Sequence, residues 1–406
     1  MQIPFSPPFI NENIELEVLD ALRSGWITSG PKVKALEQEV CNYTNAEACL
    51  CVNSATSAMM LVLHWYGVKK GDEVIVPAYT YCATALAVMH LGATPIMVDV
   101  EDDFNISVSK IKLAISSRTK AIMPVDFAGW PCNYSEINKL INEPEIKQKF
   151  KAETEQQKKL QRILVLSDAA HSFGAVYNNK KLGTAADITI FSFHAVKNLT
   201  TAEGGAICLN LPLPFNNNDV YATLRLWSLN GQTKDAFSKS KAGSWRYDIV
   251  YPGFKMNLPD VLAAIGLAQI KEYNEVLLKE RKRVFDFYSK TFSNYSWAML
   301  PPYDVPNASS SYHLYPLRIK DINEEQRDRI IEKIAETGVA VNVHFQPLPL
   351  LTVFKQMGYD INNFPSAYNN YKAEISLPIY PQLNNNKCTY IVDNVVNAIK
   401  EVLING

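Results

Sequence analysis

The 406-residue sequence predicts an α/β fold built on a mostly parallel sheet that helices cover. Short apolar runs rich in β-branched residues alternate with longer helical patterns through the first half of the chain, and this alternation is typical of βαβ units. Hydrophobic residues make up 47% of the chain and charged residues 20%, a balance that allows a full buried core. The strands expected in this sheet are residues 48–52, 73–76, 94–100, 120–127, 163–166, 188–190 and 204–209.

Helices are expected before and between these strands. The segments 11–22 and 32–43 carry apolar residues at helical spacing, and a turn-rich loop over 24–31 separates them. Hydroxyl residues at 53–57 lead from a strand into an apolar helix that ends near Gly67, and such residues are typical helix caps.

Two polar stretches interrupt the pattern. Residues 143–162 contain Pro144 followed by Lys, Glu and Gln at high density, so we expect a solvent-exposed helix or a tethered insertion there. Residues 216–244 are also polar and are expected to form a helix and a loop.

The pattern changes near residue 246. Residues 259–287 read as one long helix, and residues 312–319 alternate like a strand. We therefore predict a large α/β domain over 1–245 and a smaller C-terminal α+β domain over 246–406. The other elements expected in the smaller domain are a helix over 324–337, a strand over 339–345 and a helix over 389–403.

Composition argues against several classes of function. Forty basic and 41 acidic residues give a formal net charge of −1, without the basic excess of a general nucleic-acid binder. No apolar run approaches the roughly 20 residues of a membrane span, and the first five residues lack the regions of a signal peptide. The seven cysteines are scattered and include no C-x-x-C pair, which is typical of reduced thiols. We expect a cytoplasmic protein with no nucleic-acid or membrane partner and no metal site.

An acid and an amine follow two of the expected strands. Asp168 comes directly after the run 163–166, and Lys197 follows the run 188–190. The carboxyl ends of parallel strands meet at one edge of the sheet, where open α/β sheets bind ligands. Taken singly, a solvated lysine and a helix-capping aspartate are the ordinary interpretations, but the pair predicts a small-molecule site.

The combination fits pyridoxal phosphate. A carboxylate keeps the pyridine nitrogen protonated, so that the ring withdraws electrons, and a lysine forms an imine with the aldehyde. The helix N-terminus at Ala55 and Thr56, together with Ser192, is placed to hold the phosphate, although helix capping alone also explains that junction. Tyr81, after the next strand, is placed to stack on the ring.

Longer motifs extend this interpretation over the chain. With them, the sequence resembles the sugar aminotransferases of the DegT/DnrJ/EryC1/StrS family, which are fold-type-I pyridoxal-phosphate enzymes, from Ile3 to about Leu403. The motifs that carry the resemblance are SGWITSGP (24–31), GDEVIVP (71–77), TYCAT (80–84), SDAAH (167–171), SFHAVKN (192–198), AEGG (202–205), VHFQPL (343–348) and SLPIYP (376–381).

The resemblance implies a role for each residue of the cofactor site. Lys197 is the Schiff-base lysine and also moves the proton between the substrate carbon and the cofactor. Asp168 pairs with the pyridine nitrogen, His171 lies beside the ring near its hydroxyl, and Tyr81 stacks on the ring. The residues that match the phosphate cradle are Ala55, Thr56 and Ser192.

The resemblance also implies a homodimer whose active sites lie at the subunit interface. In the family, an asparagine before the long helix reaches the phosphate of the neighbouring subunit. Asn257 and Lys255 are the candidates here, and we favour Asn257. The residues implied to face a nucleotide sugar are His344, Thr28 and Trp26, with structural roles as the alternative.

The implied reaction consists of two half-transaminations. Glutamate gives its amino group to the cofactor and leaves as 2-oxoglutarate, and the amine then passes to the ketone of a nucleotide-linked keto-deoxysugar. An NDP-4-keto-6-deoxyhexose is preferred over an NDP-3-keto sugar, and the aminosugar product would enter lipopolysaccharide or another glycoconjugate.

Two other interpretations stay open. A pyridoxal-phosphate-dependent sugar dehydratase would share the fold, but such relatives tend to lose the lysine that this chain retains as Lys197. A non-catalytic, cofactor-bound regulator is the second, and the near-neutral charge without an added DNA-binding domain weighs against it. The sequence does not distinguish the nucleotide, amination at C3 or C4, or an axial or equatorial product.

Overall fold

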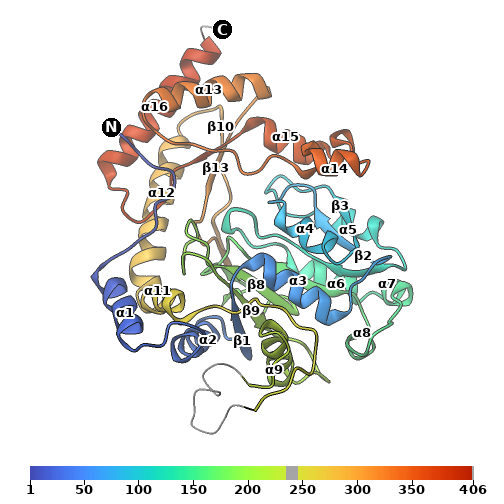
Figure 1. Ribbon diagram of the computed structural model, residues 1–406. Coiled ribbons are helices and arrows are strands. Elements are labelled where there is room, and N and C mark those ends of the chain that lie inside the picture. Colours follow the sequence, from blue (N-terminus) through green and yellow to red (C-terminus); the bar gives the residue numbers. More distant parts are fainter. Residues whose placement is uncertain (235–245, 405–406) are drawn as a thin grey trace.

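The computed structural model describes residues 1–234 and 246–404 and is organised around a seven-stranded sheet (Figure 1). Neighbouring strands from β8 to β3 run parallel, and β9 runs against both of its neighbours. The expected, mostly parallel sheet is therefore confirmed. Its strands stand in the order β1 (Ala48–Val52), β9 (Gly205–Leu209), β8 (Ile188–Ser192), β5 (Leu164–Asp168), β4 (Thr119–Ile122), β2 (Glu73–Pro77) and β3 (Thr94–Val98).

The strands bury side chains on both faces of this sheet. In β5, Leu164 and Leu166 belong to one hydrophobic core and Val165 to the other, because successive strand residues point to opposite faces. Helices that contribute to the first core include α3 (Ala55–Tyr66), α4 (Ala83–Met89) and α9 (Asn217–Ser228). Helices that contribute to the second include α2 (Pro31–Thr44), α5 (Val108–Ala114), α6 (Tyr134–Ile141) and α11 (Asp260–Lys271).

A second unit lies above the large sheet in Figure 1 and has its own hydrophobic core. Its antiparallel sheet consists of β10 (Ala298–Met299), β13 (Tyr315–Ile319) and β14 (Glu374–Leu377). The helices around that core are α12 (Lys279–Phe292), α13 (Glu324–Glu336) and α16 (Asn385–Ile404). Shorter helices are α14 (Thr352–Gln356), α15 (Pro365–Ala373) and the 3₁₀ turns Phe127–Gly129, Leu348–Leu350 and Ile361–Asn363.

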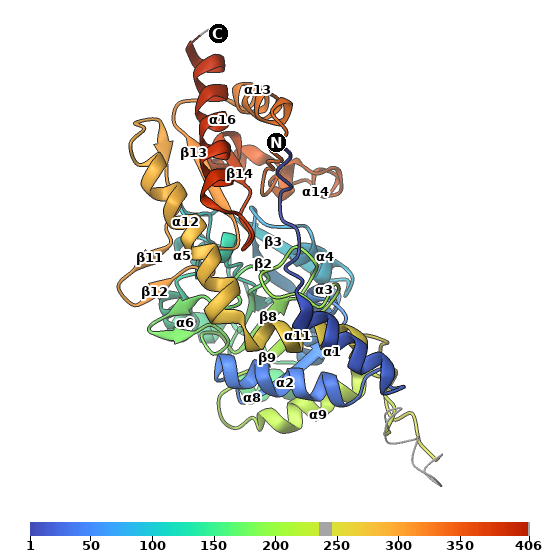
Figure 2. The ribbon, with the colours of Figure 1, turned by 90° about the vertical axis from the view of Figure 1, so that its left-hand side faces the viewer.

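Two segments join the units. The long α12 runs from the level of α11 to the second unit, and the N-terminal segment passes beside it from α1 (Glu12–Arg23) to the same unit (Figure 2). Ile3 exchanges backbone hydrogen bonds of 2.9 Å with Gly338 and Ala340. A small sheet also combines segments from both parts of the chain, β11 (Asp304–Val305), β12 (Ala308–Ser309), β6 (Val176–Tyr177) and β7 (Lys180–Lys181). The domain division at residue 246 stays a prediction.

Two expected elements differ from the structure. The long helix over 259–287 is interrupted, because the π-helical turn Tyr273–Leu278 separates α11 from α12. The strand expected over 339–345 is wrong, because this segment makes only isolated bridges, Ile3 with Val339 and Asn342 with Ser376. Its alternating apolar pattern reflects packing between the two units rather than continuous strand pairing.

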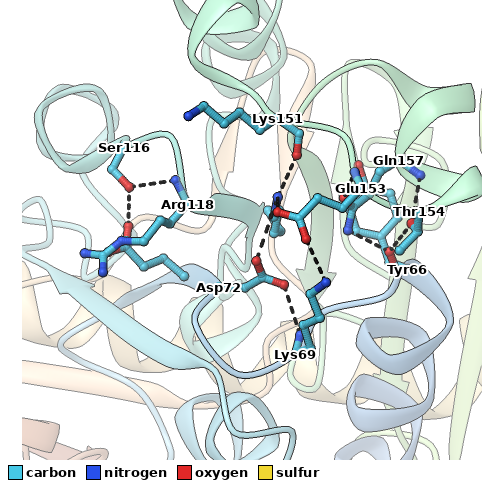
Figure 3. A network of polar contacts seen from close by, with 11 residues as sticks. Tyr66, Lys69, Asp72, Ser116, Arg118, Lys151, Glu153, Thr154 and Gln157 are labelled. Carbon is cyan, nitrogen blue, oxygen red and sulfur yellow. Dashed lines mark hydrogen bonds and ion pairs between the residues drawn. The ribbon is translucent and has the colours of Figure 1, made fainter.

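The charged stretch 143–162 is packed more closely than expected. Gln157 is fully buried, and both its side chain (3.0 Å) and the hydroxyl of Thr154 (3.1 Å) donate to the carbonyl of Tyr66 at the end of α3 (Figure 3). The buried ammonium of Lys120 donates to the carbonyl of Lys151 at 2.6 Å. The expectation of a solvated helix is therefore wrong for part of this stretch, which forms α7 (Pro144–Lys149) and α8 (Glu155–Leu160).

The polar stretch 216–244 begins with α9, as expected. The loop expected after that helix lies in part on residues 235–244, outside the described residues. Among the described helices, none combines the length and the apolar character that crossing a membrane requires.

Candidate active site

A cavity of about 500 Å³ lies at the carboxyl edge of the large sheet, within the size range of small-molecule sites. Its walls come from the large sheet, from the N-terminal segment and from the second unit. Eight of the eleven residues predicted for the site line it: Lys197, Asp168, His171, Tyr81, Ala55, Thr56, Ser192 and His344.

Lys197 lies in the turn that follows β8. Its backbone N–H donates to the carbonyl of His194 at 2.9 Å, which closes the turn and places the side chain in the cavity wall. Burial lowers the pKa of Lys197 to about 8, and the neighbouring Asp168 carboxylate partly opposes that shift. A lysine with this pKa keeps part of its amine unprotonated at neutral pH, as a nucleophile or a base requires.

Asp168 ends β5 and pairs in parallel register with Ile190 of β8. The hydroxyl of Thr84 donates to Oδ2 at 2.7 Å, and the backbone N–H of Ala170 donates to Oδ1 at 3.3 Å. Burial raises the pKa of the Asp168 carboxyl, whereas these two hydrogen bonds and the Lys197 charge lower it. The carboxyl is thus held in one orientation at the cavity wall.

A second buried carboxyl, Asp126, holds the end of β5 in place. Its backbone N–H donates to the carbonyl of Asp168 at 3.2 Å. Its side chain accepts hydrogen bonds from the backbone of Cys132 (2.8 Å) and from the hydroxyls of Tyr134 (2.8 Å) and Ser172 (2.7 Å). Burial raises the pKa of Asp126 and these three donors oppose that shift, so the pKa stands at about 6 and the carboxyl is mostly ionised at neutral pH.

The first turn of α3 faces the cavity from another side. Ser54 caps this helix, since its hydroxyl oxygen accepts the N–H of Ser57 at 3.1 Å. Ala55 and Thr56 follow, and the N–H groups of a first helical turn have no intrahelical partner and attract anions. Gly205 packs directly against this turn, because a Cβ at that position would lie 2.7 Å from the nitrogen of Ala55.

His171 is paired with a second histidine that sequence reasoning missed. Its Nδ1 accepts the N–H of Ala128 at 3.2 Å, and its ring centroid lies 4.4 Å from that of His313. His313 Nδ1 is in turn 2.9 Å from the side-chain oxygen of Asn198, the residue after Lys197. Burial lowers the pKa of both histidines well below the usual range, so both rings are neutral.

His344 lies on the wall that the second unit provides. Its ring stacks on Phe5 at 5.3 Å between centroids and meets Phe345 edge-on at 5.1 Å. Its carbonyl accepts the hydroxyl of Tyr79 at 2.6 Å. Burial, with a smaller contribution from the Lys197 charge, lowers the pKa of His344 to about 3.

Three predicted residues lie outside this cavity and close to one another. Asn257 donates to the hydroxyl of Ser29 at 2.6 Å, and Trp26 Nε1 donates to the carbonyl of Ser29 at 3.2 Å. The carbonyl of Thr28 accepts the N–H of Asp260 at 3.2 Å. The structure of one chain therefore does not bring these three residues to the cavity.

Sequence reasoning also missed Thr84, Phe5 and Phe345, which line the cavity. Thr84 had a usable signal, since it closes the motif TYCAT after an expected strand. Phe345 had a similar signal, since it follows His344 in the motif VHFQPL. Phe5 had none, because its position depends on how the N-terminal segment packs against the large sheet.

Comparisons with known proteins agree with this site. The sequence model of the DegT/DnrJ/EryC1/StrS aminotransferase family matches residues 8–149 and 152–396. The spore coat polysaccharide biosynthesis protein SpsC of Bacillus subtilis (strain 168) is 33% identical over 406 residues, which cover 99% of this chain and 97% of that protein.

Two solved structures are also similar to the whole chain. Spr1654 of Streptococcus pneumoniae, assigned as a sugar aminotransferase and solved in its PMP form, is 42% identical with a TM-score of 0.95, over 99% of this chain and 100% of that one. PseC of Helicobacter pylori, an aminotransferase involved in pseudoaminic acid biosynthesis, is 27% identical with a TM-score of 0.85, over the same shares. The predicted fold class is thereby confirmed, and the chain belongs to the DegT/DnrJ/EryC1/StrS aminotransferase family, which makes it a pyridoxal-phosphate-dependent aminotransferase.

Proposed function

We propose that this enzyme transfers the amino group of glutamate to the ketone of a nucleotide-linked 4-keto-6-deoxyhexose. The observation that carries the proposal is the single cavity that gathers Lys197, Asp168 and the first turn of α3. The likeness to Spr1654, to PseC and to SpsC supports a sugar as the amino acceptor. The aminosugar product would enter a surface polysaccharide such as lipopolysaccharide, or another glycoconjugate.

The residues of the cavity fit pyridoxal phosphate. The oriented carboxyl of Asp168 suits the pyridine nitrogen, and the amine of Lys197 suits the aldehyde carbon. The first turn of α3, with Ala55 and Thr56, suits the phosphate, and Ser192 lines the cavity between β8 and Lys197. When bound, the cofactor supplies an electron-withdrawing ring that stabilises negative charge on the substrate carbon.

The surrounding residues would then do the acid–base and orienting work. Lys197, with its lowered pKa, would move the proton between the substrate carbon and the cofactor, taking it up at one and giving it to the other from its own side of the cavity. Asp168, kept in place by Thr84, holds the positive charge of the pyridine nitrogen. His171 and Tyr81 flank the ring, and the exposed side chain of Tyr81, open over 60% of its surface, is free to cover it.

A second copy of the chain would complete the substrate site. Asn257, Thr28 and Trp26 lie together outside the cavity of their own chain. In a homodimer they would contact the cofactor or the sugar in the site of the neighbouring subunit. His344 is the substrate-facing residue that one chain supplies by itself. The proposal includes a cytoplasmic location, since all seven cysteines carry free thiols, as in proteins of reducing compartments.

The proposal is tested with the purified enzyme and a panel of nucleotide-linked 4-keto and 3-keto sugars. Glutamate is expected to bleach the visible band of the bound cofactor, and addition of the 4-keto sugar is expected to restore it with formation of an aminosugar. Faster turnover of a 3-keto sugar than of a 4-keto sugar would indicate that the enzyme aminates C3. Loss of a hydroxyl without amination would indicate a dehydratase, and a band that glutamate leaves unchanged would indicate a cofactor-bound regulator.

A further inference from the structure

A buried chain of hydrogen bonds extends behind His344, on the side of the ring away from the cavity. His344 Nδ1 lies 2.9 Å from the hydroxyl of Ser376, and that hydroxyl lies 2.5 Å from Oε1 of Glu374. The second carboxyl oxygen of Glu374 accepts the backbone N–H of His344 at 3.0 Å. Both Ser376 and Glu374 are completely buried in β14. The carboxyl therefore contacts His344 at two points, once directly and once through Ser376.

The backbone fixes this arrangement. Asn342 and Ser376 exchange two backbone hydrogen bonds of 3.2 and 2.8 Å, which dock the segment before His344 against β14. The ring is further held by its stacking on Phe5. Nδ1 is engaged by Ser376 and His344 lines the cavity, which leaves Nε2 as the ring nitrogen that can serve a ligand there.

These hydrogen bonds can point in either of two directions, because the hydroxyl of Ser376 has one proton to donate. When Glu374 is ionised, Ser376 donates to it and accepts from His344, so Nδ1 carries the ring proton and Nε2 is an acceptor. When Glu374 is protonated, its proton must lie on Oε1, because Oε2 already accepts the N–H of His344. Ser376 then accepts from Glu374 and donates to Nδ1, so Nε2 carries the proton and is a donor.

We propose that Glu374 and Ser376 are positioning residues that set, through the proton on Glu374, whether His344 offers a hydrogen-bond donor or an acceptor to the sugar substrate. This inference rests on the proposed function only for the identity of that substrate. Neither residue touches the cavity, so both act through His344.

The groups around Glu374 place this change in the hydrogen-bonding role of His344 near neutral pH. Burial raises the pKa of Glu374 to about 8, against the opposing charges of Arg327 and Arg318. Tyr79 is a further titratable group that interacts with Glu374, and burial raises the pKa of Tyr79 well above the usual range. The ring of His344 stays neutral throughout, because burial keeps its pKa at about 3. Below about pH 8, His344 thus offers a donor that suits a ketone or hydroxyl oxygen, and above it an acceptor.

The Glu374→Gln substitution separates the two directions. The amide oxygen must accept the N–H of His344, so the amide nitrogen must face Ser376 and donate to it. Ser376 then donates to Nδ1, and the ring is locked with its proton on Nε2 at every pH. Ser376→Ala breaks the chain, and Ser376→Thr, which keeps the hydroxyl, restores it.

The test is nitrogen NMR of the histidine side chains in the cofactor-loaded enzyme without substrate, with the His344 signals assigned from a His344→Gln variant. In the wild type, the proton of the His344 ring is expected to move from Nε2 to Nδ1 as the pH rises through about 8. In Glu374→Gln the proton is expected to stay on Nε2, and in Ser376→Ala the tautomer is expected not to respond to pH. A wild-type tautomer that is the same from pH 6 to pH 10, or a Glu374→Gln ring that still switches, overturns the proposal. The first of these readouts is made on the wild-type enzyme and uses a variant only to assign the His344 signals, so it does not depend on the folding of Glu374→Gln or Ser376→Ala.

Kinetics then distinguish this proposal from the proposed function. At pH 9, Glu374→Gln is expected to change the KM for the keto sugar severalfold while leaving the glutamate half-reaction within about twofold of wild type. If no keto sugar in the panel is aminated but the tautomer still switches, the proposed function fails and the hydrogen-bond chain stands. An unchanged KM together with a switching tautomer overturns the assigned role toward the sugar.

Discussion

Lowering the pH below 8 is expected to slow the covalent capture of pyridoxal phosphate by Lys197 in the cofactor-free enzyme. The attacking species is the unprotonated amine, and burial lowers the pKa of Lys197 to about 8 from the roughly 10.4 of an ordinary lysine. At pH 7 about a tenth of the amine is then unprotonated, compared with about 0.04% for an ordinary lysine, a difference of roughly 200-fold. The reaction with Lys197 should therefore rise about tenfold from pH 7 and level off above pH 9.

The assay mixes cofactor-free enzyme with pyridoxal phosphate, reduces the adduct with borohydride at timed intervals and quantifies the modified peptide by mass spectrometry. Lys197→Ala is the control for the other lysines. Asp168→Asn adds a second check, since the Asp168 charge raises the pKa of Lys197 and its removal should shift the midpoint to lower pH. A midpoint near 10, or an equal yield of adduct in Lys197→Ala, would refute the burial argument.

Three further substitutions follow from the geometry around the cavity and the insertion. Thr84→Val removes the 2.7 Å hydrogen bond to the buried Asp168 at a cost of about 1.5–3 kcal/mol. A cofactor titration should therefore show roughly 10- to 100-fold weaker binding, and Thr84→Ser should restore the affinity. Equal affinity in both variants would show that this hydrogen bond is dispensable. Gly205→Ala would place a Cβ 2.7 Å from the nitrogen of Ala55. In the same titration it should weaken cofactor binding by about 1–3 kcal/mol. Unchanged binding would mean that the first turn of α3 takes no part in holding the cofactor. Gln157→Ala removes two hydrogen bonds of a buried side chain and should lower the free energy of unfolding in urea denaturation by about 1–3 kcal/mol. The neighbouring Gln156→Ala should lower it by no more than about 0.5 kcal/mol, and equal losses would contradict the anchoring of the charged stretch 143–162 by Gln157.

The large sheet was predictable because its strands are buried on both faces. Continuous apolar runs such as ILVL at 163–166 are typical of parallel strands covered by helices. The segment 339–345 shows the limit of that reasoning. Its alternating pattern resembles a strand, but its backbone forms a bridge with β14 at Asn342 and another with Ile3 at Val339, and no continuous ladder in the described residues.

The residues of the candidate site that lie at the ends of strands could be predicted from the sequence. Asp168 ends β5 and Lys197 lies in the turn after β8, and neighbouring parallel strands bring such residues to one edge of the sheet. His313 and Phe5 reach the cavity only because distant segments fold back over that edge, and neither lies in a local pattern that marks it. The role predicted for Asn257 requires a second copy of the chain, and it stays a prediction.

The central claim is that this cavity passes an amino group from glutamate to a sugar ketone through Lys197. Glutamate labelled with ¹⁵N, incubated with the cofactor-loaded enzyme and a nucleotide-linked 4-keto-6-deoxyhexose, tests that claim most directly. The account predicts ¹⁵N in the amine of the nucleotide sugar with wild type and none with Lys197→Ala. Labelled product from Lys197→Ala, or release of 2-oxoglutarate by the wild type with no nitrogen transferred to any keto sugar, would contradict it.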